Sequence, residues 1–282
     1  MAISAADVKA LREKTGAGMM DCKKALQEAE GDFAKAERIL KELGLAAASK
    51  RLGRATNEGR IFTMILPDKA GALELSCETD FVARNADFIA MGEELVEEFL
   101  TKGTPLDDPS IGQRIAEAVS KIKENMAVRR FAKMDVGANE TVVDYIHGDT
   151  GSIGVLVKLS VGDPGARDNA VLKNFAFDVA LHVAAFNPSY LSAETVDSEY
   201  LKEQEDIFTK QAQSMGKPEK VVEGIVKGKL RKHLSEICLL DQPFVKDDKR
   251  SVGAVAKDIG KEVGTDVNVV EFLYLRVGEE IS

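Results

Sequence analysis

The sequence contains no tryptophan, and its 282 residues include only three cysteines, three histidines and 6% aromatic residues. The cysteines, Cys22, Cys77 and Cys238, are odd in number and far apart. This spacing argues against a disulfide framework and a zinc site, and it fits a reducing compartment. The N-terminus lacks the apolar core of a signal peptide, and no stretch approaches the roughly 18 apolar residues of a membrane span. We therefore expect a cytoplasmic protein without membrane contacts.

The sequence also lacks the motifs of common enzyme classes. It has no Walker A sequence, and its histidines, His147, His182 and His233, lie outside any HExxH or nucleophile-elbow pattern. We expect His182, which lies in an apolar segment, to be a hydrogen-bonded core residue, and His233 to face solvent. The sequence therefore favours a protein that is not an enzyme and has no cofactor or metal site. An enzyme would require an unrecognised site between subdomains.

Basic residues are outnumbered by acidic ones, 38 to 47, which gives a net charge of -9. A general nucleic-acid binder needs a basic surface for its phosphate contacts, so direct nucleic-acid binding is disfavoured. Lys50, Arg51 and Arg54 form a locally basic segment, but it is short. The 44% apolar and 30% charged residues, without low-complexity tracts, predict a folded chain of two or three domains.

Residues 1–54 predict a small three-helix domain followed by a basic linker. Ser4 is a suitable N-cap for the first helix, and the glycines at 16 and 18 separate it from a second helix over 19–29. The third helix follows Gly31 and is expected to end at Gly44. The linker that continues to Arg54 could be extended or helical.

A change of hydrophobic period near Arg60 predicts an α+β core. "RIFTMIL" and "ALELSCE" alternate as two strands of a hairpin, and helices are expected over 88–101 and 111–132. The pattern of hairpin followed by helix recurs in "TVVDYI", "IGVLVKLSV" and "AVLKNFAFDVALHVAAF". We therefore predict two pseudo-repeated subdomains, related by pattern and not by residue identity. The first covers 55–139; the second begins with 140–193 and is completed by 238–282.

Residues 194–237 predict a protruding antiparallel helical hairpin. Apolar residues recur at helical spacing on both sides of the turn "GKPE". This seam could close on itself, on a second copy of the chain, or on a subdomain.

The stretch "CETDFVARN", residues 77–85, places a large apolar ring, Phe81, where a strand turns into a helix. Phe81 could fold back on the following helix near Asn85 and Phe88, as a hydrophobic staple does. Alternatively, the ring is exposed and available for burial in a partner. Asp80 could cap the helix in either case.

Two motifs carry a resemblance to a known family. "LREKTGAGMMDCKKALQEAEGD" and "CETDFVARNADF" occur in order and are followed by "HGDTGSIGVLV", "HVAAFNPSYL", "SMGKPEK" and "QPFV". Over nearly its whole length the chain resembles bacterial elongation factor Ts. The resemblance implies a guanine-nucleotide exchange factor that binds elongation factor Tu, GDP-bound and nucleotide-free, and displaces Mg²⁺ so that GDP leaves and GTP rebinds. It also implies that the N-terminal domain is ubiquitin-associated-like (UBA-like) and that the helical hairpin can support a homodimer or a 2:2 complex.

The resemblance also assigns roles to individual residues. Thr79, Asp80, Phe81 and Val82 would form the Mg²⁺-displacing element, with Phe81 entering between helices of the GTPase. The implied partner contacts are Val8, Lys9, Arg12, Met19, Met20 and His147. Lys9 and Arg12 could instead be a solvated face, and His147 could cap its turn. The adjacent methionines cannot both face the bundle core equally, so one of them is expected to be exposed.

Three features depart from the family pattern. Lys123 stands where a glycine that helps to contact the partner is expected, the turn after His147 is longer, and the chain ends at "VGEEIS" without a further helix. They affect the peripheral contacts that the resemblance implies. The alternative function is a UBA-like scaffold or chaperone without exchange activity.

Overall fold

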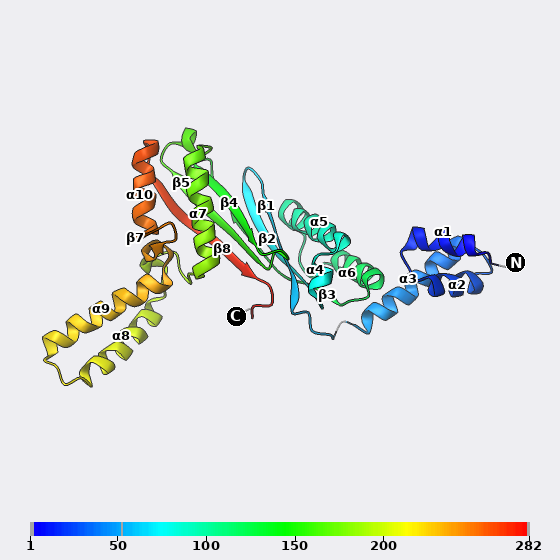
Figure 1. Ribbon diagram of the computed structural model, residues 1–282, viewed down its shortest axis with the longest axis horizontal. Coiled ribbons are helices and arrows are strands. Elements are labelled where there is room, and N and C mark those ends of the chain that lie inside the picture. The colour runs from blue at the N-terminus through cyan, green and yellow to red at the C-terminus, as the bar shows by residue number, and fades with distance from the viewer. Residues whose placement is uncertain (1–2, 52, 281–282) are drawn as a thin grey trace.

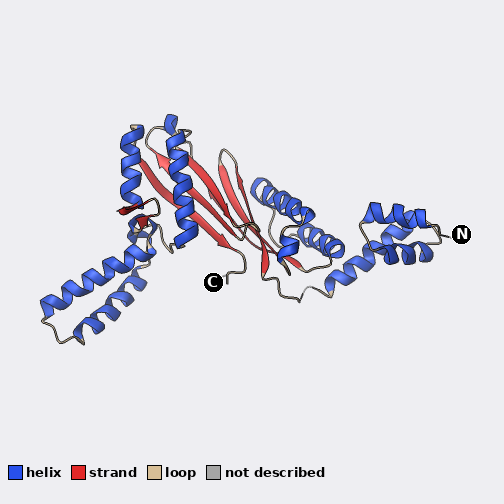
Figure 2. Ribbon diagram, in the orientation of Figure 1, coloured by secondary structure: helices blue, strands red, loops and turns tan. Residues whose placement is uncertain are grey.

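The computed structural model describes residues 3–51 and 53–280. Figure 1 shows an elongated molecule with a helical bundle at one end, two sheets in the middle and a helical hairpin at the other end. Helices and antiparallel strands alternate irregularly along the chain, and each of the two central sheets is covered by helices on its outer side (Figure 2). The predicted α+β class is confirmed.

The N-terminal bundle consists of α1 (Ala5–Thr15), α2 (Met19–Glu28) and α3 (Phe33–Ser49). Ser4 caps α1 in a reciprocal capping box with Asp7, as its position in the sequence indicates. The small core between the helices includes Val8, Leu11, Cys22, Ala25, Leu26, Ala36 and Leu40.

The prediction that the third helix ends at Gly44 is wrong, because α3 continues to Ser49. Gly44 allows close helix packing and does not end the helix. A Cβ atom built there would lie 2.0 Å from Ser120 Oγ, on a helix of the next subdomain. The missing side chain thus lets α3 lie directly against that helix, and the alanine-rich residues after Gly44 favour the helical conformation.

Repeat one, residues 58–135, is built on the antiparallel sheet β1-β2-β3. β1 (Glu58–Ile65) and β2 (Lys69–Cys77) form the predicted hairpin, and α5 (Ala86–Lys102) packs on both strands. The single turn α4 (Asp80–Ala83) links β2 to α5, and α6 (Pro109–Ile122) precedes β3 (Met126–Asp135).

The helix predicted over 111–132 is wrong in its second half. α6 ends at Ile122, Lys123 adopts a left-handed conformation with φ of 70°, and β3 pairs with β2 from Met126 onward. The free edge of β2 accounts for this outcome. It offers a ladder of backbone hydrogen bonds that the isolated sequence does not reveal.

Repeat two, residues 140–186 and 252–276, has the same topology on the sheet β4-β5-β8. β4 (Glu140–His147) and β5 (Ile153–Val161) form the hairpin, and η1 (Pro164–Ala166) leads to α7 (Ala170–Phe186). α10 (Val252–Val263) then precedes the third strand, β8 (Val267–Arg276). Both central strands carry a register shift, at Glu74/Leu75 in β2 and at Lys158/Leu159 in β5.

The two sheets face each other and share a core that includes Ile61, Ala72, Val142, Leu156 and Leu275. Side chains of alternate residues on β2 and β5 face either this shared core or the covering helices. The central strands are therefore buried on both faces, which makes the double sheet a firm support for its connecting turns.

The predicted helical hairpin is formed by α8 (Ser198–Gln213) and α9 (Glu219–Ile237) and projects from repeat two (Figure 1). Its seam closes on itself around Ala212, Val222 and Val226. The segments η2 (Ala193–Thr195), η3 (Leu239–Asp241), β6 (Pro243–Phe244) and β7 (Asp247–Ser251) connect it to repeat two. Across residues 3–51 and 53–280, no helix is both long enough and apolar enough to cross a membrane.

Two histidine predictions can be compared with the structure. His182 is fully buried, with Nε2 2.8 Å from Gln242 Oε1 and Nδ1 accepting from the Val245 N–H at 3.2 Å, so the core assignment is confirmed. Burial lowers the pKa of His182. The prediction that His233 faces solvent is wrong, because its ring is half-buried and lies 2.9 Å from the Tyr200 hydroxyl.

Candidate functional site

The turn after β2 displays Phe81 as the most exposed large apolar side chain among the described residues. Its exposed fraction is 82%, whereas the next two residues, Val82 and Ala83, are buried against β2 and α5. Thr79 caps the turn by accepting a hydrogen bond from the Val82 N–H at 3.4 Å. The staple alternative is therefore wrong for Phe81. The chain is fixed on both sides of a ring that points into solvent.

Asp80 does not cap this turn, because Thr79 takes that position. Instead, the Asp80 carboxylate lies 3.5 Å from the Arg84 guanidinium on the next turn of chain. Both side chains are about half exposed, so the pair adds little to stability.

The turn is also tied to the loop between α6 and β3. The Glu124 carboxylate accepts from the Thr79 N–H at 3.0 Å and from the Thr79 hydroxyl at 2.8 Å. In the opposite direction, Glu78 accepts from the Asn125 N–H at 2.6 Å, and the Asn125 amide donates to the Arg54 carbonyl at 2.8 Å. The sequence prediction missed Glu124 and Asn125. They are more than 40 positions from the turn, in a segment predicted to be helical.

Cys77 supports the turn from the buried side. Its thiol donates to the Thr79 carbonyl at 3.1 Å. Burial, with a smaller contribution from the negative charge of Glu124, raises the pKa of the Cys77 thiol to about 12. At neutral pH this group therefore stays protonated and acts as a donor.

The residues predicted on the bundle differ in accessibility. Lys9 and Arg12 are exposed, whereas Val8 is buried in the bundle core. Met19 and Met20 are exposed, at 44% and 63%, so the expectation of an exposed methionine is confirmed, and the exposure extends to both residues. Because α2 begins at Met19, both thioethers lie at the helix end beyond the reach of the small core.

His147, the last residue of β4, is exposed and is held by an aromatic neighbour. Its Nδ1 lies 2.8 Å from the Tyr145 hydroxyl, and the Tyr145 ring packs edge-on against Phe177 of α7 at 5.7 Å. The turn after His147 docks on repeat one, where the Gly151 carbonyl accepts from the Ile61 N–H at 2.8 Å.

The predicted residues do not form one cluster. Those of the bundle lie at one end of the molecule, and α4 lies at the centre (Figure 1). A partner that touched all of them would have to extend along the protein. This arrangement suits a large macromolecular ligand better than a small molecule.

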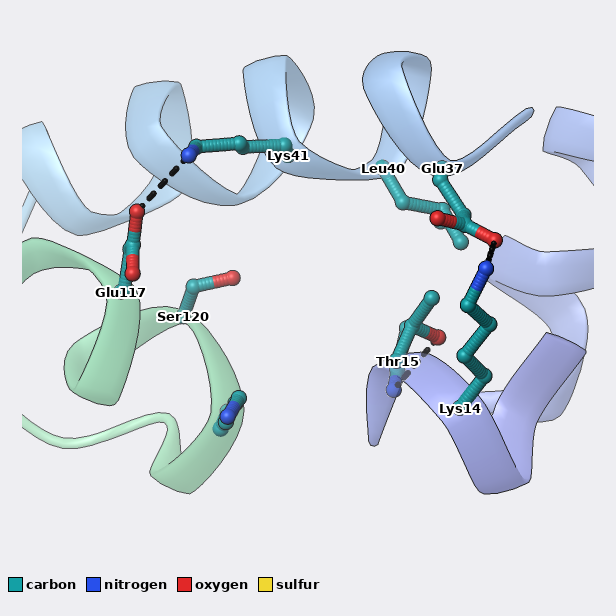
Figure 3. A pocket seen from close by; sticks show the side chains of 9 residues that line it. Lys14, Thr15, Glu37, Leu40, Lys41, Glu117 and Ser120 are labelled. Atoms are coloured by element: carbon teal, nitrogen blue, oxygen red, sulfur yellow. Dashed lines mark hydrogen bonds and ion pairs between the residues drawn. The ribbon is translucent and has the colours of Figure 1, made fainter. Parts of the chain in front are cut away.

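A pocket of about 260 Å³ separates the bundle from α6. Figure 3 shows Lys41 reaching Glu117 across it and Lys14 reaching Glu37 within the bundle. The Lys41–Glu117 distance is 2.9 Å. Both lysines are thus paired with carboxylates, and the pocket is a polar seam between bundle and repeat one. Within the described part of the chain, no group of three or more His, Cys, Asp or Glu side chains is placed to hold a metal ion.

Comparison with known proteins gives consistent matches. The family model described as elongation factor TS matches residues 78–279. The chain is 47% identical to elongation factor Ts of Borrelia recurrentis over 278 residues, covering 99% of this chain and 100% of the relative. It is 48% identical to that of Borreliella burgdorferi over 98% of this chain and 99% of the relative. Identity to the Treponema denticola protein is 46% over 99% of both chains.

Proposed function

Because the chain belongs to the elongation factor Ts family, we propose that it binds elongation factor Tu·GDP and promotes GDP release by displacing Mg²⁺ from that GTPase. Family membership makes the chain a translation elongation factor. The proposal adds the partner, the mechanism and a cytoplasmic site of action. GTP then rebinds to the emptied partner, and the factor itself makes and breaks no covalent bond.

The observation that carries the proposal is the exposure of Phe81 on a fixed turn. An aromatic ring that is 82% exposed has almost all of its apolar surface left to bury. Such a ring can remove some 150–250 Å² from water in a partner's groove. Thr79 and the buried Val82 hold the backbone, so little ordering entropy opposes the insertion.

Displacement of a metal ion needs no catalytic group on this chain. Mg²⁺ demands near-ideal octahedral geometry and neutralises the charge of bound phosphates. A wedge that shifts the elements around the ion by a fraction of its ligand distance would weaken its coordination. Uncompensated phosphate charge then favours loss of the nucleotide. We assign the wedge to Phe81, presented by Thr79, Asp80 and Val82.

Linkage fixes the energetic requirement. A factor that weakens nucleotide binding must itself be bound less tightly by the nucleotide-loaded GTPase, and by the same ratio. A ratio of about 10⁴ corresponds to about 5.5 kcal/mol of coupling, more than one ring supplies. We therefore assign further binding energy to other surfaces. These are the exposed Lys9, Arg12, Met19 and Met20 of the bundle, with buried Val8 shaping α1, and His147 on repeat two.

We assign self-association, as a homodimer or in a 2:2 complex, to α8 and α9. Their seam is filled by their own residues, so a second copy would use the exposed Ile207, Met215 and Val221. Sedimentation of the protein with and without elongation factor Tu tests this assignment. It is contradicted if only one copy of this chain is present in the free protein and in the complex.

The decisive experiment is release of labelled GDP from elongation factor Tu at saturating factor. Phe81→Ala should slow release by roughly tenfold or more, as expected when an aromatic anchor of an interface is truncated. The melting temperature should not change, because the ring contributes little to the protein's own core.

Phe186→Ala is the matched control. Phe186 is also an exposed ring, at 55%, but it lies at the end of α7, where it packs on His182. Release should be unaffected by this change. An unchanged release rate for Phe81→Ala would contradict the wedge. If the unmodified protein did not accelerate GDP release, the scaffold or chaperone alternative would be favoured.

A further inference from the structure

We propose that Glu124 is a positioning residue for Phe81, since its carboxylate locks the Thr79 end of the turn and so fixes the direction of the ring. This inference rests on the proposed exchange function. It adds a residue that lies outside the exposed turn. Glu124 belongs to the loop between α6 and β3, 45 positions after Thr79 in the chain.

Glu124 satisfies both donors of one residue. Its two oxygens accept from the Thr79 N–H and the Thr79 hydroxyl, at 3.0 and 2.8 Å. Because the Thr79 hydroxyl donates its hydrogen bond to Glu124, a lone pair of the same oxygen is oriented toward the Val82 N–H. The carboxylate therefore also orients the cap on the far side of Phe81. Both bonds have a charged acceptor, which makes them stronger than neutral ones.

The loop that carries Glu124 is itself anchored. Asn125, the next residue, is 4% exposed and bonds Glu78 and the Arg54 carbonyl. Glu78 thus reaches from turn to loop, and Glu124 reaches from loop to turn. These reciprocal bonds extend the pairing of β2 and β3 beyond its last pair, Cys77 with Met126.

Repeat two shows how the same position is built where no ring is displayed. Its last pair of β5 and β8 is Val161 with Val267, and the residue two positions beyond β5 is Asp163. The Asp163 N–H donates to the Thr265 hydroxyl at 2.8 Å. Thr265 therefore stands where Glu124 stands in repeat one. Together with the bond from the Gly162 N–H to the Asp266 carbonyl at 2.9 Å, this neutral contact closes the turn without a charged group. The two charge-assisted hydrogen bonds of Glu124 in repeat one therefore exceed what closing the turn requires.

The experiment compares Glu124→Ala and Glu124→Gln with Thr265→Ala, which removes the equivalent contact from repeat two. GDP release from elongation factor Tu is measured over a range of factor concentrations, to separate the rate at saturation from the half-saturating concentration. Glu124→Ala should lower the saturating rate by roughly tenfold, because two charge-assisted hydrogen bonds are lost. Glu124→Gln keeps one acceptor and should fall in between. Thr265→Ala should leave release unchanged.

A second measurement does not depend on exchange. Amide hydrogen exchange at Thr79 should accelerate at least tenfold in Glu124→Ala and Glu124→Gln, with the β2 core amides unchanged, and remain as in the unmodified protein in Thr265→Ala. Glu124→Gln keeps this measurement available if the alanine variant fails to fold.

Double variants test whether Glu124 acts through the ring. In a Phe81→Ala background, Glu124→Ala should cause no further loss of release rate. The proposal would be overturned if the two substitutions lowered the release rate by independent factors that multiply in the double variant. It would also be overturned if Glu124→Ala promoted GDP release at the normal rate while Phe81→Ala promoted it slowly. If Phe81→Ala alone promotes GDP release normally, the wedge role of Phe81 and the positioning role of Glu124 in exchange are both contradicted, although the exchange function stands. If the unmodified protein does not accelerate release, the exchange function itself fails, and the Thr79 hydrogen-exchange data still show whether Glu124 holds the turn.

Discussion

Repeat one and repeat two share a backbone plan but differ in what they display where the central strand ends. Repeat one continues from Cys77 into a turn that exposes Phe81. Repeat two continues from Val161 into η1, where Pro164 and Gly165 carry no large side chain. The difference indicates that the turn is the specialised part and that the double sheet is the support.

The two repeats also place ion pairs of opposite polarity at their register shifts. In repeat one, Glu74 on the central strand pairs with Arg130 on the third strand at 2.7 Å. In repeat two, Lys158 on the central strand pairs with Glu271 at 2.6 Å. In both repeats the partners are register neighbours. One structural plan thus accommodates either sign of charge, provided that the charge is matched across the strands.

The largest expected effect comes from breaking the pair of repeat one, with the pair of repeat two as the comparison. Glu74 is fully buried and also accepts from the Gly278 N–H at 2.9 Å. Glu74→Gln should cost about 3 kcal/mol, because an amide donor would face the partly buried Arg130 or that N–H. Lys158→Met should cost about 1 kcal/mol, since the 41% exposed side chain of Glu271 can turn to water.

Urea denaturation of both variants measures the difference. The midpoint should shift far more for Glu74→Gln, with the slope unchanged in both. Equal shifts would show that the two pairs have the same energetic weight despite their different burial.

A second difference concerns the helix before the third strand, because α6 supports the bundle and α10 does not. Gly44→Ala would place Cβ 2.0 Å from Ser120 Oγ and force α3 away from α6. We expect a loss of about 2 kcal/mol from this contact, typical of overpacking. Spin labels at the exposed positions Lys23 and Glu97 should report a longer and broader distance distribution.

Gly112→Ala in α6 is the control, because nothing lies within 4 Å of its added Cβ. It should leave the label distances unchanged. Adding Ser120→Gly to Gly44→Ala should restore them. A distribution that Gly44→Ala leaves unaltered would contradict a fixed bundle.

The sequence predicted the parts of the fold that depend on short-range periodicity. The alternation in β1, β2, β4 and β5 and the helical spacing of α5 and α7 identified these elements, and residues 77–85 identified the Phe81 turn. The apolar face of each element is encoded within its own residues, so the pattern is visible without the fold.

The sequence could not show what depends on contacts between distant segments. β3 was missed because its partner strand is far away in the chain, and Glu124 was missed with it. Gly44 was misread as a helix end because its close approach to Ser120 depends on tertiary packing. A glycine at position 123 would have signalled the end of α6, but lysine stands there.

The smallest expected effect concerns the end of α6 and the equivalent end of α10. Lys123 and Gly264 both end the helix before a third strand, with φ of 70° and 76°. A side chain in this conformation costs about 1 kcal/mol relative to glycine. Lys123→Gly should therefore raise the free energy of unfolding by about 0.5–1 kcal/mol, and Gly264→Lys should lower it by a similar amount. No neighbour lies within 4 Å of a Cβ at Gly264, so that variant isolates the backbone cost. Thermal unfolding of both variants measures the two shifts, and shifts of the same sign would contradict a shared conformational origin.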